Sequence, residues 1–246
     1  MKSIKSTLVL IALVFLASAC GPKGSTVETS DAKEVASAKE ATSMAVNINN
    51  SMVTWIGSKP AGKHNGSIGI STGEIQVSGT DIVAGNFTID ITSLKVLDIP
   101  ADNENNGKLS GHLMSPDFFD AASHATATFE VTSVSTFDAT ALSADVEEYK
   151  TDYSPAAMSE IMVDNPTHMI SGNLTMRGTT KNITFPASVA IDNGVVKAKA
   201  NFNINRTDWG LMYNDEANAV DKAKDSFIYN TVNVGFQLEA GTSATM

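Results

Sequence analysis

The sequence predicts an all-β protein whose antiparallel strands close into a barrel or pack as a sandwich. In FTIDIT, the apolar residues Phe87, Ile89 and Ile91 alternate with polar ones, and VVKAKANFNIN and VNVGFQLEA repeat this pattern. One apolar face and one polar, solvent-exposed face are typical of antiparallel sheet. Helical periodicity is nearly absent, and roughly eight or nine such strands fit in the chain. We expect closure, because it removes exposed strand edges.

Two segments interrupt the alternation. In GHLMSPDFFDAASHATATF, Ser115 can cap a helix, Pro116 suits the first helical position, and Asp117 suits the positive helix end, so we expect a short helical turn near residues 115–121. Residues 138–167 form a long excursion that we expect to be partly helical, with a second helix start at Ser154 and Pro155. Connections of this length are often lids or binding elements.

The N-terminus has the pattern of an export signal. Lys2 and Lys5 precede a short apolar run that ends in small residues, which predicts a signal peptide over residues 1–19. The single cysteine, Cys20, follows LASA and resembles the lipidated cysteine of bacterial lipoproteins. We therefore expect Cys20 to be a lipid anchor in the cell envelope, at the periplasmic face or the outer membrane. The alternative is a secreted protein with a stray cysteine.

Composition sets the domain boundaries and excludes one class of partner. Residues 20–44 are rich in small and charged residues and predict a flexible tether, followed by a β-barrel domain over 45–240 and a tail over 241–246. Loss of residues 1–19 removes two lysines and no acid, which moves the formal net charge from −10 to −12. An acidic domain repels phosphate backbones, so we expect no nucleic-acid partner.

No local motif predicts catalysis or metal binding. The four histidines, at 64, 112, 124 and 168, have no metal-ligand spacing, and no nucleophile elbow or phosphate loop is present. We therefore expect no catalytic residues, no metal and no catalytic cofactor. An enzyme using His64, His112 or His168 remains a third hypothesis.

Arg206 has two interpretations. It continues the apolar face of Phe202 and Ile204, which would place a cation at a barrel mouth where it could pair with an anionic head group. Alternatively, it pairs with Asp208 or another acid and closes the end of the barrel.

Four segments in series resemble the YceI-like family. They are WIGSKPAGKHNGSIGI, GHLMSPDFFDAASHATATFEV, GNLTMRGTTKNITFPASV and FNINRTDWG, and the resemblance covers about Met52 to Leu238. It departs at Ala125, where the family usually has proline, at residues 109–111, where an Arg-Asp pair is common, and in the long excursion. The resemblance implies a lipocalin-like antiparallel barrel around a long apolar cavity that holds an isoprenoid chain.

The leading hypothesis is a lipoprotein that binds an isoprenoid quinone, a polyprenyl phosphate or a similar long-chain lipid for storage, transport or protection. The alternative is a structural or stress-related envelope protein with a packed barrel that binds another protein through its surface. Homodimerisation stays open. The predicted ligand-binding residues are Phe87, Ile89, Ile91, His112, Phe118, Phe119, Phe129, Leu174, Met176, Phe202, Ile204, Arg206 and Phe236.

Overall fold

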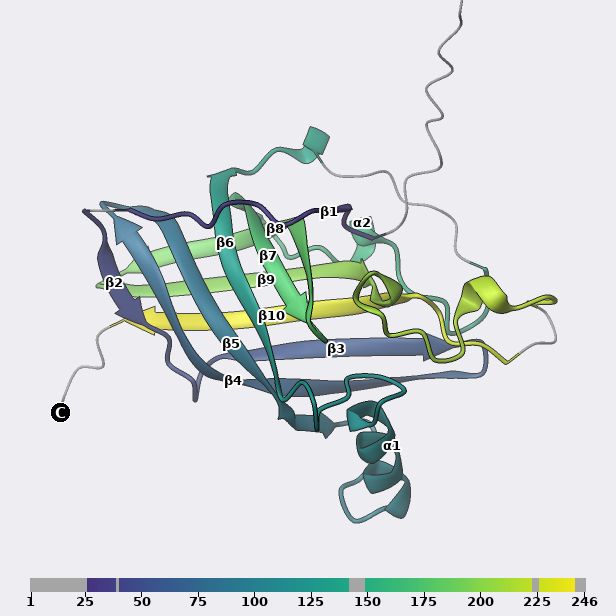
Figure 1. Cartoon of the computed structure of the whole chain (residues 1–246). Coiled ribbons are helices and arrows are strands. Elements are labelled where there is room, and N and C mark those ends of the chain that lie inside the picture. The colour runs from purple at the N-terminus through teal and green to yellow at the C-terminus, as the bar shows by residue number, and fades with distance from the viewer. Residues whose placement is uncertain (1–25, 39, 142–148, 223–225, 242–246) are drawn as a thin grey trace, which may run out of the picture.

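The computed structural model describes residues 26–38, 40–141, 149–222 and 226–241, and it is an eight-stranded antiparallel barrel (Figure 1). Each strand pairs with its neighbour, and β10 pairs with both β9 and β3, which closes the sheet. The barrel prediction is confirmed over the sandwich. The strands are β3 (Met52–Lys59), β4 (Gly62–Ser78), β5 (Asp81–Val96), β6 (Thr126–Thr136), β7 (His168–Met176), β8 (Thr179–Asp192), β9 (Val195–Asn205) and β10 (Thr231–Gly241).

Tight turns and strict alternation set the register of the strands. Arg177 and Gly178 join β7 to β8, and Asn193 and Gly194 join β8 to β9; all four residues have positive φ. Two-residue turns with positive φ match the twist of antiparallel strands, and Gly is the residue that adopts this conformation without strain. On β5 the predicted apolar row is buried inside the barrel, which confirms the predicted alternation.

A helix that was not predicted lies next to the barrel, and it ends where the predicted turn begins. The helix α1 (Glu104–Met114) is capped at its start by Asn103, whose side chain accepts the backbone N–H of Asn105. Ser115 ends α1 and also starts the turn that was predicted, because its hydroxyl oxygen accepts the backbone N–H of Asp117 and its carbonyl accepts that of Phe118. Helix α1 does not continue through Ser115 because Pro116 disfavours helical backbone in the preceding residue, and Ser115 is extended. Hydrogen-bonded turns over residues 116–119 follow.

Part of the expected tether is paired with the barrel. The strand β1 (Thr29–Ser30) pairs with β8, and β2 (Thr42–Ala45) pairs with β4. Between them the backbone of Ala36 donates to Val131. Strand pairing therefore begins at Thr29, which is earlier than the expected domain boundary at residue 45. Residues 1–25, which include the predicted signal peptide and Cys20, and the tail from residue 242 lie outside the described residues.

The excursion after β6 is partly helical, as predicted. It contains the 3-10 turn η1 (Ala139–Ala141) and α2 (Met158–Ile161), while residues 142–148 lie outside the described part. Two more 3-10 turns, η2 (Arg206–Trp209) and η3 (Glu216–Asn218), lie between β9 and β10. Among the described residues, no helix combines the length and the apolar character needed to cross a bilayer.

Candidate functional site: an apolar cavity at one end of the barrel

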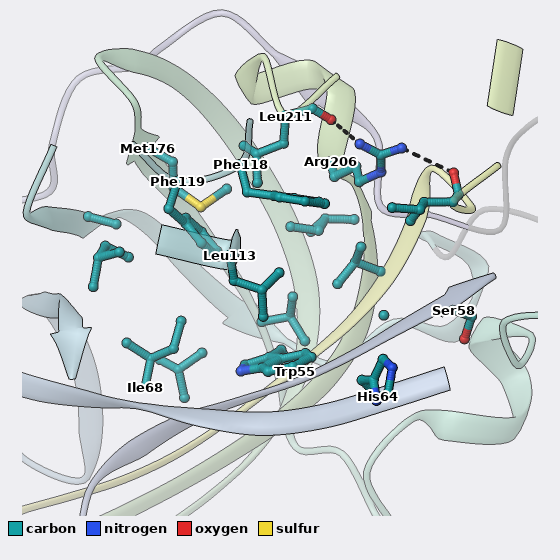
Figure 2. A pocket seen from close by; sticks show the side chains of 18 of the residues that line it. Trp55, Ser58, His64, Ile68, Leu113, Phe118, Phe119, Met176, Arg206 and Leu211 are labelled. Atoms are coloured by element: carbon teal, nitrogen blue, oxygen red, sulfur yellow. Dashed lines mark hydrogen bonds between the residues drawn. The ribbon is translucent and has the colours of Figure 1, made fainter. Parts of the chain in front are cut away.

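One end of the barrel is hollow. A cavity of about 190 Å³ lies inside the end where β3 turns into β4, which is at the right in Figure 1. Helix α1, the turns after it and the segment between β9 and β10 surround its mouth (Figure 2). Its walls are Val53, Trp55, Gly57, Ser58, Lys59, Gly62, His64, Ile68, Ile89, Ile91, Leu109, Leu113, Phe118, Phe119, Ala127, Leu174, Met176, Ile204, Arg206, Leu211, Ile228, Val232 and Val234.

A layer of phenylalanine rings forms the floor of this cavity. On four strands the ring lies two positions further into the barrel than a residue of the cavity wall. Phe87 lies below Ile89, Phe129 below Ala127, Phe202 below Ile204 and Phe236 below Val234. Phe185 from β8 completes the layer. Phe185 stacks on Phe202 at 4.3 Å between ring centroids, and Phe87 stacks on Phe129 at 5.3 Å. The rings of Phe129 and Phe236 each lie against Phe185, at 5.6 and 5.2 Å.

The floor shortens the space available to a ligand. Four of its five rings are fully buried within the hydrophobic core, and Phe236 is partly buried against it. A close-packed aromatic layer leaves no passage for a chain without moving rings. The cavity is therefore confined to one end of the barrel. It is shorter than the long cavity that the family resemblance implied.

Trp55 contributes its indole ring to the cavity wall, where the ring lies over the backbone of a glycine. Its strand partner is Gly66, and a Cβ on Gly66 would lie 2.4 Å from the indole Cζ2 atom. The indole Nε1 is buried, and no described residue accepts its N–H. The wall is otherwise aliphatic or aromatic, apart from polar residues at the mouth. Such a surface suits a hydrocarbon rather than a polar substrate.

Two phenylalanines close part of the mouth. Phe118 and Phe119, from the turns after α1, both lie against the cavity, as Figure 2 shows. Arg177 holds this segment in place, because its Nη1 donates to the carbonyl of Phe118 at 2.6 Å and to that of Gly210 at 3.0 Å. Phe118 is backed by the rings of His112, at 5.1 Å, and Tyr213, at 5.4 Å.

His112 lies behind this closure. Its ring meets Tyr213 edge-on at 4.7 Å, and its Nε2 lies 2.9 Å from Oδ2 of Asp117. It is not among the wall residues of the cavity. The geometry therefore makes His112 a residue that positions Phe118.

The side chain of Arg206 is buried and hydrogen-bonded to backbone carbonyls. Its side chain is 3% exposed, and its guanidinium donates to the carbonyl oxygens of Leu211, Ile228 and Tyr229 (Figure 2). Burial lowers the pKa of Arg206, and the nearby charges of Asp215 and Glu216 oppose this shift. Asp208 instead accepts from the Thr29 hydroxyl, so the expected pairing with Asp208 is absent. Arg206 thus binds the two ends of the segment between β9 and β10 together at the mouth, which is the closing role that one interpretation gave it.

His64 and Asp98 form a polar pair at the mouth. The Nδ1 of His64 lies 2.8 Å from Oδ2 of Asp98, and the backbone N–H of Asn65 donates to Oδ1 at 2.9 Å. Burial raises the pKa of Asp98, but these hydrogen bonds outweigh it, and the pKa lies below its usual value. An ionised Asp98 therefore fixes the orientation of His64 beside the cavity.

The structure divides the predicted site residues into three groups. Eight lie in the cavity wall: Ile89, Ile91, Phe118, Phe119, Leu174, Met176, Ile204 and Arg206. Phe87, Phe129, Phe202 and Phe236 form the floor, and His112 backs the closure. Cys20 lies outside the described residues. Whether any of these residues binds a ligand stays a prediction.

Sequence reasoning missed several wall residues. Trp55, Val232 and Val234 lie on strands whose alternation was recognised, so the inward rows held a signal that could have found them. Leu109 and Leu211 carry no such signal, because they come from a helix and a loop that only tertiary packing brings to the mouth. In the described part of the chain, no cluster of His, Cys, Asp and Glu could hold a metal ion.

Comparison with known proteins identifies the family. The family model of the YceI-like domain matches residues 38–240. This chain belongs to the YceI-like family. A search of curated proteins finds no match.

Two solved structures share the fold of this YceI-like chain. BcnA from Burkholderia cenocepacia has a TM-score of 0.53 and 16% identity, over 79% of this chain and 99% of that one. A polyisoprenoid-binding domain from Saccharophagus degradans, implicated in plant cell wall breakdown, has a TM-score of 0.52 and 17% identity, over 81% of this chain and 98% of that one. At these identities the likeness establishes the fold alone.

Proposed function

We propose that this YceI-like protein binds the hydrocarbon chain of an isoprenoid-type lipid in the cavity at the end of its barrel. The observation that carries the proposal is a cavity of about 190 Å³ with an almost entirely apolar wall. Each CH₂ group moved from water into such a wall gains about 0.8 kcal/mol, so the chain alone supplies affinity. The solved polyisoprenoid-binding domain with the same fold supports this choice of ligand class.

The polar head group stays at the mouth in this proposal. The wall offers it few partners, and burying an unpaired polar group is costly. At the mouth, Lys59 is exposed and His64 is held by Asp98, so donors are available there for a quinone carbonyl or a phosphate. The role is binding for storage, transport or protection, with no catalytic step.

We also propose that the chain is a lipoprotein of the cell envelope, anchored through Cys20. The support is the sequence pattern at residues 1–20. Mass spectrometry of the mature N-terminus tests this: a diacylglyceryl group on Cys20 is expected, and a free thiol or a chain that begins elsewhere would refute it.

The alternative is a packed barrel that acts only through its surface. The packed phenylalanine floor agrees with it, but the cavity at the end of the barrel does not. The five rings fill one layer, whereas the wall above them encloses open space. A purely structural barrel has no need of this space, because an empty cavity costs stability.

Organic extraction of the purified protein followed by mass spectrometry tests the binding proposal. An isoprenoid lipid is expected in the wild type and absent from Val234→Phe, which places a ring in the cavity from the wall residue Val234. Ile56→Phe is the matched control, because Ile56 is exposed next to the wall residue Trp55 and should retain the lipid. Folded wild type that neither carries lipid nor takes up a quinone or a polyprenyl phosphate would refute the proposal.

A further inference from the structure

Exposed apolar side chains gather around the mouth of the cavity. The described residues include nine large hydrophobic residues that are exposed, and four of them belong to segments that form this mouth. They are Leu97, Met212, Tyr213 and Val220, and we call them the apolar rim. A single exposed apolar residue is ordinary, but several around the opening of an apolar cavity indicate an interaction site.

Contacts place two rim residues at the mouth, and position in the chain places the other two in a segment that forms it. Leu97 donates its backbone N–H to Asn65, next to the wall residue His64. Met212 follows the wall residue Leu211, and Tyr213 packs on Phe118. Val220 is 98% exposed, in the loop after η3 that stands out at the right of Figure 1. The rim therefore comes from two segments at this end of the barrel, the residues after β5 and the connection between β9 and β10.

The described chain also begins at this end of the barrel. The backbone N–H of Val27 donates to Asn203 at 2.8 Å, and Thr29 donates to Asp208 at 3.0 Å. Both acceptors lie within three residues of Arg206, which holds the segment between β9 and β10 at the mouth. Only six peptide units separate Cys20 from Thr26, and they span at most about 20 Å. A lipid anchor on Cys20 would thus keep Thr26, at this end of the barrel, within that reach of a bilayer.

We propose that the apolar rim docks on the surface of a lipid bilayer, so that a hydrocarbon chain passes between the bilayer and the cavity without crossing water. The proposal rests on the proposed function, because it concerns how the cavity is loaded. It commits to a membrane of zwitterionic lipids, since the formal net charge is −10 for the whole chain and −12 without residues 1–19, and anionic head groups would repel it. Exposed aliphatic side chains with a tyrosine among them suit the boundary between head groups and acyl chains.

Site-specific fluorescence tests the docking directly. The full mature chain with acylated Cys20 is placed on phosphatidylethanolamine and phosphatidylcholine vesicles, with a fluorophore at Met212→Cys or Val220→Cys. Ile48→Cys is the matched control, because Ile48 and Met212 are both 48% exposed, and the neighbours of Ile48 pair with Glu239 and Ala240 at the opposite end of the barrel. Nitroxide groups on the lipid acyl chains should quench positions 212 and 220 strongly and position 48 weakly. Equal quenching at all three positions, or none at 212 and 220, would overturn the proposal.

The uptake rate of a quinone from vesicles separates this proposal from the proposed function. The double variant Met212→Ser and Val220→Ser should take up quinone about tenfold more slowly than wild type, while Ile48→Ser does not. Quinone delivered from detergent should bind both variants as it binds wild type, because the cavity is unchanged. If no form binds quinone, the proposed function fails, whereas the quenching pattern still decides whether the rim docks. Unchanged uptake by the double variant would overturn the docking proposal.

Discussion

Gly172 shows why one position of the barrel interior has no side chain. A Cβ there would lie 2.1 Å from Cζ of Phe129, a buried ring that stacks on Phe87. The ring has no empty space into which it could move, because both rings belong to the packed floor. The glycine in GNLTMRG thus makes room for a floor ring on the neighbouring strand.

We expect Gly172→Ala to lower the free energy of unfolding by about 1–3 kcal/mol, the usual cost of overpacking a core. Urea denaturation measures this cost. Gly57→Ala is the control, because a Cβ at Gly57 meets nothing within 4 Å. Equal effects of the two substitutions would contradict the explanation.

The pair of His64 and Asp98 predicts a pH dependence. The pKa of Asp98 is lowered in the folded protein, so its contribution to stability is present above its usual pKa of 3.8 and is lost as the pH falls below it. Asp98→Asn should therefore destabilise the protein at pH 7, by no more than about 1 kcal/mol for a partly exposed pair.

Urea denaturation of wild type and Asp98→Asn at pH 7 and below pH 3.8 checks this sign. The difference in unfolding free energy should shrink at the lower pH. In His64→Gln, the effect of removing Asp98 should be smaller but not zero, because the bond from Asn65 remains. A difference that grows on acidification would refute the assignment.

At the scale of the element, buried asparagines fasten the N-terminal segment to the barrel wall. The amide of Asn173 on β7 donates to the carbonyl of Lys33 at 2.7 Å and accepts its N–H at 3.0 Å. Asn182 on β8 donates to the same side chain. Polar groups buried in this way are stable only when they are hydrogen-bonded, so Asn173 determines where the segment lies.

Asn173→Ala should leave the backbone groups of Lys33 and the amide of Asn182 without this partner, at a cost of about 1–3 kcal/mol. Hydrogen exchange should accelerate at the amides of residues 29–38, with little change in β3 and β4. Asn201→Ala is the control, because Asn201 accepts from Asn233 on β10 and does not contact the N-terminal segment. Unchanged exchange in Asn173→Ala would show that other contacts hold the segment.

The helix α1 is an element that the sequence analysis did not predict. A serine before a proline can end one helix and start a turn, and Ser115 does both, because it follows Met114 of α1 and its carbonyl accepts the backbone N–H of Phe118. The segment LSGHLM carries little helical signal, because it contains a glycine and has no buried face: none of the residues of α1 is fully buried. Leu109 and Leu113 instead face the cavity, where only the folded barrel provides a partner.

At the scale of the whole molecule, the phenylalanine floor sets how deep a ligand can reach. Phe202 is central to it, because its ring stacks on Phe185 at 4.3 Å and meets Phe236 at 6.1 Å. Removing this ring would open the cavity toward the other half of the barrel. The length of chain that fits then depends on one side chain.

Phe202→Ala should shift binding toward longer isoprenoid chains and lower the unfolding free energy by about 3–5 kcal/mol. Competition between quinones of increasing chain length measures the shift. Phe227→Ala is the control, because Phe227 is equally buried but packs on Tyr149 and Tyr229 away from the floor. An unchanged order of preference in folded Phe202→Ala would show that the floor does not limit the chain.

The sequence by itself determined the antiparallel strands, the apolar interior and the family, because alternation assigns each side chain to one face of a strand. It did not determine depth along the barrel axis. Phe87, Ile89 and Ile91 look alike in the pattern, yet one is floor and two are wall. Only the tertiary structure decided this, because the floor forms where rings from five strands meet in one register. The same holds for Arg206, because only the folded connection between β9 and β10 brings the carbonyls of Tyr229 and Ile228 to its guanidinium.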